Sequence, residues 1–449
     1  MSTKWIPESV RTVHWNRYRL YSPDDGVIAR GNTLSYLPRI ADSELTQRLA
    51  AAGAVVIEGP KACGKTETAR RQSNSVVLLD IDLQAQAAAQ TDPSLLLDGA
   101  VPRLFDEWQV APVLWNQVRR AVDSRQQPGQ FILTGSSVPP DDVDRHTGAG
   151  RFSFVRMRPM SLFEAGHASG QISVAEVFSA VPVRATDSGL TVPRIAELVT
   201  IGGWPAQRST TLPSAAQASI DYVHQVCTVD VTRVGATRRD PLKVAALMRS
   251  LARNVATEVS VSTLAADAGG ADSEFSRVTV SEYLSALERL MVIEDQPAWS
   301  PHVRSARQLR SSPKRHFVDP SLAVAALRVG PQRLLNDLQF LGFLFESLVI
   351  RDLRVYSQPL GGTVLHYRDN KGLEVDAIVE LADGRWAAFE IKLGQGAIDQ
   401  AAGSLLRFRQ VVDVERCGEP AVLGVITGTG YGFVREDGIA VIPIGALGP

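Results

Sequence analysis

The chain of 449 residues has few cysteines and no long apolar run. Its three cysteines, Cys63, Cys227 and Cys417, are far apart and lack metal-ligand spacing. This distribution argues against a disulfide framework and against a zinc site. The most apolar stretch, residues 340–350, is interrupted by a glycine and a glutamate and is shorter than the roughly 18 residues of a membrane helix.

The chain also lacks a net charge of either sign, because 47 Lys and Arg nearly cancel 48 Asp and Glu. No global field therefore attracts it to nucleic acid or to a membrane, and any such attraction needs a local patch. Residues 1–21 carry scattered charges and no apolar signal core. With 45% apolar and 21% charged residues, the sequence predicts a folded, cytoplasmic protein of about three domains.

Short apolar runs alternate with helical patterns in the first half of the chain, between residues 43 and 164. This alternation predicts an α/β fold with a parallel sheet covered on both faces. The runs lie at residues 54–58, 76–80, 103–106 and 131–133.

A glycine-rich loop follows the first of these runs. It reads Gly59-Pro60-Lys61-Ala62-Cys63-Gly64-Lys65-Thr66 and fits G-x-x-x-x-G-K-[ST] between a predicted strand and a predicted helix. Backbone N–H groups and the helix N-terminus would bind phosphate, Lys65 would reach the β- and γ-phosphates, and Thr66 would hold Mg²⁺. For Cys63, a small packing role is favoured over a partly exposed, reactive thiol.

Two further strand ends carry polar groups suited to nucleotide hydrolysis. Asp106 would hold Mg²⁺ and Glu107 would polarise the attacking water. Thr134, in the run Thr134-Gly135-Ser136-Ser137, is a candidate for orienting that water, with Ser136 as the alternative. Arg151 is a candidate charge-stabilising arginine, acting in its own chain or on a neighbouring subunit, and a solvated surface arginine is the alternative.

Together these segments resemble a prokaryotic AAA-type ATPase family that carries a C-terminal domain of unknown function. The resemblance extends from about residue 30 to residue 408 and includes Gly202-Gly203-Trp204-Pro205, which is similar to that family's Gly-Gly-aromatic-Pro element. It implies an AAA+ sheet with a helical lid and identifies Asp106 and Glu107 as the Walker B pair. Trp108 departs from the aliphatic residue expected there.

The middle of the chain predicts a winged-helix module, with helices near residues 262–268 and 278–291 followed by a short β-like run. Residues 301–318 contain no carboxylate, so a basic patch there can bind a nucleic-acid backbone. A packing module with a solvated loop is an equally weighted alternative. The predicted contacts are Arg304, Arg307, Arg310, Lys314 and Arg315.

Near the C-terminus, Asp376 lies in one predicted strand, and Glu390 and Lys392 share one face of the next strand. Glu346 lies on the preceding helix. Carboxylates around a divalent metal with a nearby ammonium suit phosphodiester hydrolysis, and the pattern resembles the PD-(D/E)-x-K endonuclease core. Glu346, Asp376 and Glu390 are the expected metal ligands. Chance charge pairing on a sheet is the alternative.

The sequence therefore predicts an ATP- and Mg²⁺-dependent ATPase that controls a nuclease-like domain acting on nucleic acid, with DNA favoured. The alternative is a non-catalytic ATPase switch that binds DNA or a protein partner, as in a toxin–antitoxin or defence system. A homo-oligomer and a protein partner are further expectations, and no membrane partner is expected. The expected domains are an N-terminal extension (1–42), the AAA+ core (43–165), a helical lid or linker (166–239), the winged-helix-like module (240–329) and a restriction-endonuclease-like α/β domain (330–449).

Overall fold

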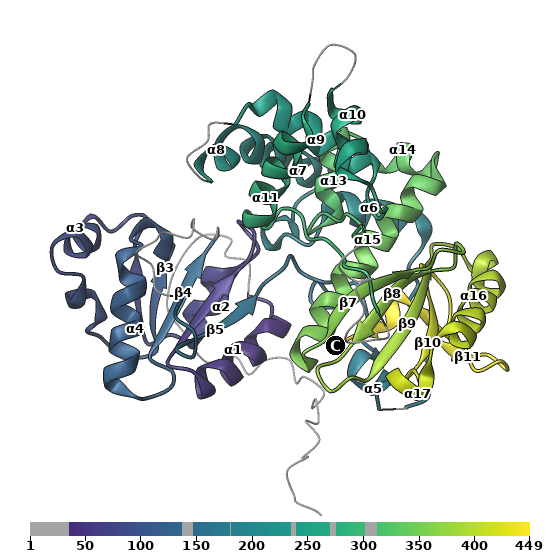
Figure 1. Ribbon diagram of the computed structural model, residues 1–449, viewed down its shortest axis with the longest axis horizontal. Helices are drawn as coiled ribbons and strands as arrows, with labels where there is room; N and C mark the ends of the chain where they lie inside the picture. The colour runs from purple at the N-terminus through teal and green to yellow at the C-terminus, as the bar shows by residue number, and fades with distance from the viewer. Residues whose placement is uncertain (1–35, 137–146, 180, 235–238, 270–274, 301–311) are drawn as a thin grey trace, which may run out of the picture. The chain divides into compact units, whose positions relative to one another are not determined.

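The computed structural model describes residues 36–449 except for 137–146, 180, 235–238, 270–274 and 301–311. Residues 36–449 form one compact unit (Figure 1). Within it, two main sheets are each covered by helices, and a mostly helical region lies between them in the sequence.

The first sheet is parallel throughout and has the strand order β2-β3-β4-β1-β5. This arrangement confirms the predicted α/β class. Because β4 lies between β1 and β3, the ends of these three strands meet at one edge of the sheet. The strands are β1 (Ala54–Glu58), β2 (Ser75–Leu78), β3 (Arg103–Asp106), β4 (Phe131–Gly135) and β5 (Phe152–Arg156).

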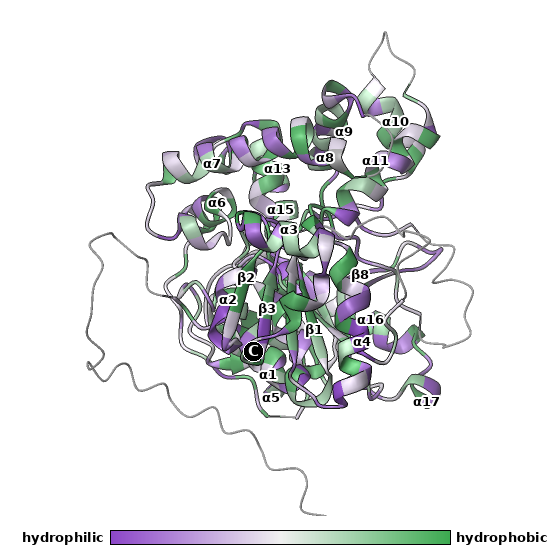
Figure 2. Cartoon of the chain, turned by 90° about the vertical axis from the view of Figure 1, so that its left-hand side faces the viewer, coloured by the Kyte–Doolittle hydropathy of each residue, from purple (hydrophilic) through white to green (hydrophobic). Residues whose placement is uncertain are grey.

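Helices cover both faces of this sheet because alternate residues of each strand point to opposite sides. Val55 and Ile57 pack with residues of the helices α1 and α2, whereas Ala54 and Val56 pack with residues of α3, η1 and α4. In Figure 2, covering helices such as α4 show bands of hydrophobic and hydrophilic colour. The covering helices are α1 (Ile40–Ala51), α2 (Lys65–Gln72), α3 (Leu83–Thr91), η1 (Pro93–Leu97) and α4 (Val113–Arg125), and the short helix η2 (Trp108–Val110) follows β3.

The middle region is mainly helical. In it, α9, α10 and α11 are followed by two antiparallel bridges, Ile293 with Phe317 and Gln296 with Lys314. A winged helix requires helices followed by a hairpin of this kind, and that assignment stays a prediction. The elements of this region are β6 (Ile172–Ser173), α5 (Val174–Val177), α6 (Val192–Ile201), η3 (Pro205–Gln207), α7 (Leu212–Gln225), the π-helix η4 (Val226–Asp230), α8 (Val231–Arg233), α9 (Pro241–Arg253), α10 (Val261–Gly269), α11 (Arg277–Arg289), α13 (Pro320–Leu327) and α14 (Pro331–Leu335).

The second sheet is mixed and has the order β11-β12-β10-β9-β8-β7. Residues of α15 pack against Ala377, Val379 and Phe389 on one face, and residues of α16 pack against Ile378 and Ala388 on the other. The elements are α15 (Leu338–Ser357), η5 (Gln358–Leu360), β7 (Thr363–Arg368), β8 (Glu374–Glu380), β9 (Trp386–Lys392), η6 (Gln395–Ala397), α16 (Ile398–Val411), α17 (Val414–Cys417), β10 (Leu423–Thr427), β11 (Phe433–Val434), β12 (Ala440–Pro443), η7 (Ile444–Ala446) and β13 (Leu447–Gly448).

The segment that follows the first sheet pairs with the C-terminal end of the chain. Strand β13 is parallel to β6, and an isolated bridge joins Ala185 to Gly432. Part of the predicted lid or linker therefore packs with the C-terminal domain and is not helical.

The described part of the chain contains no helix with the length and hydrophobicity required to span a bilayer.

Candidate nucleotide site and C-terminal carboxylate cluster

The glycine-rich loop connects β1 to α2 and has the tight backbone that phosphate binding needs. A Cβ atom at Gly59 would lie 2.3 Å from the Met157 carbonyl oxygen, so only glycine fits. Gly64 caps α2 with φ of +104°, a left-handed conformation that glycine adopts readily. Cys63 is fully buried, with its Sγ 3.9 Å from the Met157 carbonyl oxygen, in agreement with the packing role.

Lys65 and Thr66 begin helix α2 directly after the loop. The Lys65 ammonium donates to the carbonyl oxygens of Gly59 (3.0 Å) and Pro60 (2.8 Å). The Thr66 hydroxyl donates to Oδ1 of Asp106 at 2.9 Å, and the Thr134 hydroxyl donates to the same oxygen. The structure thus brings together Lys65, Thr66, Asp106 and Thr134 from three different segments.

A hydroxyl and a buried carboxylate in contact are hard oxygen donors of the kind that Mg²⁺ binds together with nucleotide phosphates. Thr66 and Asp106 therefore fit the magnesium ion that a phosphate loop of this type uses. A magnesium ion held there would neutralise charge on the nucleotide phosphates.

Glu107 follows Asp106 in a left-handed backbone conformation with φ of +53°. Non-glycine residues held in this way cluster at functional sites, because the surrounding structure must stabilise the strained backbone. One carboxylate oxygen of Glu107 accepts from the Gln109 side chain and, at 3.4 Å, from the Ser136 hydroxyl. Gln109 and Ser136 thus fix the carboxylate that would polarise water. Ser137 lies outside the described residues.

Arg151 lies at the other end of the sheet. It directly precedes Phe152, which is paired with Ala54 at the start of β1, whereas the phosphate loop follows the end of β1. Its side chain donates to Asp123 on α4 at 2.7 Å. Arg151 therefore does not face the phosphate loop of its own chain, and a role on a neighbouring subunit stays a prediction.

Two contacts that the sequence did not predict attach the loop to other segments. The buried Arg39 guanidinium donates to the Cys63 carbonyl at 2.7 Å and to Glu164 at 3.0 Å. Lys61 forms a 2.6 Å ion pair with Asp230 of the π-helix η4. The loop is therefore bound on one side to the start of α1 and on the other to the helical middle region.

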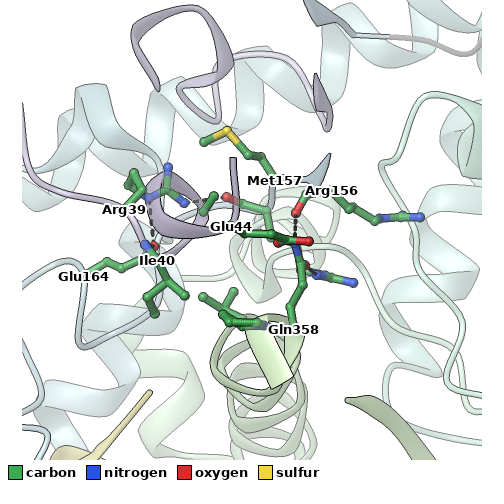
Figure 3. A pocket seen from close by; sticks show the side chains of 11 residues that line it. Arg39, Ile40, Glu44, Arg156, Met157, Glu164 and Gln358 are labelled. Carbon is green, nitrogen blue, oxygen red and sulfur yellow. Dashed lines mark hydrogen bonds and ion pairs between the residues drawn. The ribbon is translucent and has the colours of Figure 1, made fainter. Parts of the chain in front are cut away.

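A small pocket adjoins Arg39 at the end of β5, and Figure 3 shows its lining. Arg39 and Glu164 point toward each other, and Gln358 reaches in from the end of α15. The Gln358 amide donates to the Arg156 carbonyl oxygen (2.9 Å) and to Glu44 (2.6 Å). The end of β5 and helix α1 are thereby linked to the first helix of the C-terminal domain.

Glu294 adds ion pairs to this contact between the end of β5 and α15. Arg158 donates to both of its carboxylate oxygens, at 2.8 and 2.6 Å, and Arg354 of α15 lies 3.6 Å away. Burial acts to raise the pKa of Glu294, but Arg158, Arg354 and Arg156 outweigh it and hold the pKa well below its ordinary value.

A buried charged triad connects the Gly-Gly-Trp-Pro element to α15. Arg351 donates to Asp319 at 2.8 Å and to its neighbour Asp352 at 2.7 Å. Asp319 also accepts from the Gly203 backbone N–H at 2.9 Å, and Asp352 accepts from the Leu162 N–H at 3.0 Å. The triad therefore joins the segment after β5, the middle region and the C-terminal domain.

The four residues predicted near the C-terminus do converge. The Lys392 ammonium lies 3.0 Å from Asp376 Oδ2 and 2.6 Å from Glu390 Oε2. The Ile391 N–H also donates to Asp376 Oδ2, at 2.9 Å. Glu346 on α15 joins them through Lys314, whose ammonium donates to Glu346 at 2.6 Å and to Asp376 Oδ1 at 3.3 Å. We refer to Glu346, Asp376, Glu390, Lys392 and Lys314 as the C-terminal cluster.

The carboxylates of this cluster differ in their ease of protonation. Burial raises the pKa of Glu346 to about 7, although Lys314 opposes the shift. Burial and the charge of Asp376 raise the pKa of Glu390. Burial acts in the same direction on Asp376, but Lys314 and Lys392 outweigh it and lower the pKa of that carboxyl.

The donor set of the cluster does not fit a divalent metal as it is arranged here. Both oxygens of Asp376 already accept from ammonium or backbone N–H groups, and the Lys314 ammonium lies between Asp376 and Glu346. Within the described residues, no three His, Cys, Asp or Glu side chains form a group suited to holding a metal ion.

The predicted basic patch is only partly within the described residues. Lys314 is buried in the C-terminal cluster, and Arg315 pairs with Asp295. Neither side chain is exposed to a nucleic-acid backbone in this structure. Arg304, Arg307 and Arg310 lie outside the described residues.

The parallel sheet, the phosphate loop and the Thr66–Asp106 contact mark a P-loop ATPase domain in the first part of the described chain. In agreement, residues 51–166 match the family model of an AAA domain. Residues 192–333 and 341–447 match two families described as domains of unknown function, DUF8612 and DUF4143.

Two mycobacterial proteins are similar over most of the chain. Uncharacterized protein Rv2008c of Mycobacterium tuberculosis and uncharacterized protein Mb2031c of Mycobacterium bovis are each 26% identical over 363 residues, which is 79% of this chain and 73% of each relative. Among solved structures, the Walker-type ATPase PABY2304 of Pyrococcus abyssi is 13% identical with a TM-score of 0.38, covering 64% of this chain and 94% of that one.

Proposed function

We propose that this ATPase is a nucleotide-controlled switch whose phosphate loop acts on the middle region and on the C-terminal domain. The proposal is carried by two contacts that attach the phosphate loop to other segments. They are the Lys61–Asp230 ion pair and the hydrogen bond from Arg39 to the Cys63 carbonyl oxygen. A ligand that rearranges the loop must break or move these bonds. Their partners lie outside the first sheet, so a local change there affects distant segments.

We assign each residue of the site a role in the hydrolysis step. Lys65 would turn from the two loop carbonyls to the β- and γ-phosphates, Thr66 and Asp106 would hold the magnesium ion, and Glu107 would accept a proton from the attacking water. Thr134 bonds to Asp106 and so positions that carboxylate. Gln109 and Ser136 orient Glu107.

Hydrogen–deuterium exchange on two variants tests the switch. Glu107→Gln should retain bound ATP, and we expect ATP to change protection from exchange in η4 and in α15 as well as around the loop. Lys65→Ala serves as the matched control, because it loses the phosphate contact and should show no change. A change confined to residues 51–166 in the ATP-bound Glu107→Gln protein would contradict the proposal.

A second candidate is a nuclease that the ATPase controls, acting on nucleic acid and on DNA in particular. The convergence of Glu346, Asp376, Glu390 and Lys392 favours it. Arg304, Arg307 and Arg310, which lie outside the described residues, would supply phosphate contacts. The test is cleavage of supercoiled, linear and single-stranded DNA with Mg²⁺ or Mn²⁺, with and without ATP. Cleavage that Lys392→Ala abolishes would establish the nuclease function. If protein that hydrolyses ATP cleaves none of these substrates, the switch proposal is favoured, with a protein as its partner.

Assembly into a homo-oligomer is a separate proposal. It would give Arg151 access to the phosphate of a neighbouring chain. Arg151→Ala tests it: slower hydrolysis that active-site mixing with Lys65→Ala protein partly restores would support a role between subunits. Unchanged hydrolysis would leave Arg151 as a surface residue.

A further inference from the structure

We infer that the ammonium group of Lys314 takes the place of a divalent metal in the C-terminal cluster. The inference does not depend on the proposed switch. It bears on the second candidate function, because a cluster closed in this way does not perform metal-dependent hydrolysis.

The contacts of Lys314 carry the first step. Its Nζ atom is within 2.6 Å of a Glu346 oxygen and 3.3 Å of an Asp376 oxygen, so one cation bridges the helical carboxylate and the strand carboxylate. A divalent metal shared by these two carboxylates would have to occupy the same space. Two cations at such short range repel strongly in a buried site, so they exclude each other.

Lys314 is also held in position by its backbone and by its neighbours. Its backbone N–H and carbonyl both pair with Gln296. The Gln296 amide donates to the carbonyl oxygens of Asp376 and Leu365, each at 2.9 Å. His316 lies between Gln296 and Ser347, at 3.1 and 3.2 Å, and so connects this hairpin to α15 beside Glu346. These bonds place the ammonium in the cluster as part of the fold.

The charge balance points the same way. The three carboxylates carry at most three negative charges, and Lys314 and Lys392 supply two positive charges among them. A buried group of charges is stable only when it is paired, and this group is nearly neutral without a metal. Removing the Lys314 charge would leave two acidic side chains without their shared cation, and a divalent metal could then replace it.

Mn²⁺ titration of the nucleotide-free full chain tests the inference, with bound metal counted by electron paramagnetic resonance. We expect the C-terminal cluster of the wild-type protein to bind no Mn²⁺, so Asp376→Asn should not lower the amount of bound metal. Any Mn²⁺ at the phosphate loop is identified separately, because Asp106→Asn should remove it. Lys314→Met, which removes the ammonium and keeps an unbranched side chain one atom shorter, should gain one Mn²⁺ site at least about tenfold tighter than any at the wild-type cluster. That site should disappear in Lys314→Met/Asp376→Asn.

Arg315→Met is the matched control, because it removes the adjacent cation, which pairs with Asp295 and lies outside the cluster. It should leave Mn²⁺ binding unchanged. One Mn²⁺ per wild-type chain, lost in Asp376→Asn, would overturn the inference, as would a folded Lys314→Met protein that gains no site. The wild-type titration decides the matter by itself if Lys314→Met does not fold.

Discussion

At the phosphate loop, the Lys65 ammonium donates to two backbone carbonyl oxygens, whereas in the C-terminal cluster the Lys314 ammonium donates to two carboxylates. Asp106 likewise accepts from two neutral hydroxyls, whereas Asp376 accepts from two ammonium groups. The first site therefore keeps uncompensated charge for a ligand, and the second satisfies its charges internally. Similar residue types form an open site in one case and a closed one in the other.

The largest expected effect is on ATP hydrolysis. Glu107→Gln should lower kcat at least about 100-fold while ATP still binds, because the water loses its proton acceptor. Lys65→Ala should abolish both binding and turnover. Phosphate release and nucleotide titration measure the two properties.

Glu67→Gln is the control for this pair of variants, since Glu67 lies exposed on the same helix α2 and pairs with Arg70. It should hydrolyse ATP at the wild-type rate. Turnover above a tenth of wild type in Glu107→Gln would remove Glu107 from the mechanism.

Breaking an internally satisfied group should instead affect folding. Arg351→Leu leaves Asp319 and Asp352 buried without their cation, and we expect about 3–5 kcal/mol of lost stability in urea unfolding. Arg409→Leu removes an exposed ion pair with Glu419 and should cost less than about 1 kcal/mol. Equal losses of stability in the two variants would show that the buried triad contributes no more to folding than an exposed ion pair.

Glu294, another buried and internally paired charge, should make the folding stability depend on pH. Its pKa is depressed in the folded protein, so the unfolded chain binds more protons below the ordinary glutamate pKa. The stability that Glu294 contributes is present above about pH 4.5 and is lost as the pH falls through the folded-state pKa. Glu294→Gln should therefore lose less stability than wild type between pH 5 and 3. Parallel acid unfolding curves for the two proteins would contradict this.

The smallest effect is expected at the Lys61–Asp230 pair, because Lys61 is about half exposed and solvent screens the interaction. Asp230→Asn should change the KM for ATP by about two- to fivefold, with kcat nearly unchanged. Asp221→Asn on the exposed face of α7 is the matched exchange and should leave KM as in wild type. The same KM in all three proteins would show that the contact between the loop and the middle region does not affect ATP binding.

The first sheet and its loop were predictable because their signals are local. The Gly59–Thr66 spacing, the apolar run before it and the acidic pair after the third run each lie within a few residues. The order of the strands was not predictable in this way, since nothing in the sequence near Phe131 shows that β4 lies between β1 and β3. The role of Arg151 within its own chain was not predictable for the same reason, because its position after Gly148 and Gly150 says nothing about which end of the sheet it occupies.

In the C-terminal domain, the sequence identified the residues of the cluster other than Lys314, which pairs with two of its carboxylates. The spacing of Asp376, Glu390 and Lys392 follows from strand periodicity and is visible in sequence. Lys314 was grouped with a basic surface patch, because its burial depends on a bridge to Gln296 and on contacts with α15 far along the chain. Arg39 was missed because one arginine before a helix carries no local signal.

The pairing of β13 with β6 has a consequence for inheritance. The C-terminal domain is completed by β6 (Ile172–Ser173) and by Ala185, and residues 192–333 lie in the sequence between these residues and the rest of that domain. Recombination at a single point within the middle region would pass on a domain without its matching strand. A single crossover before residue 172 would instead pass on β6, the middle region and the C-terminal domain together, so these three parts are expected to diverge as one unit.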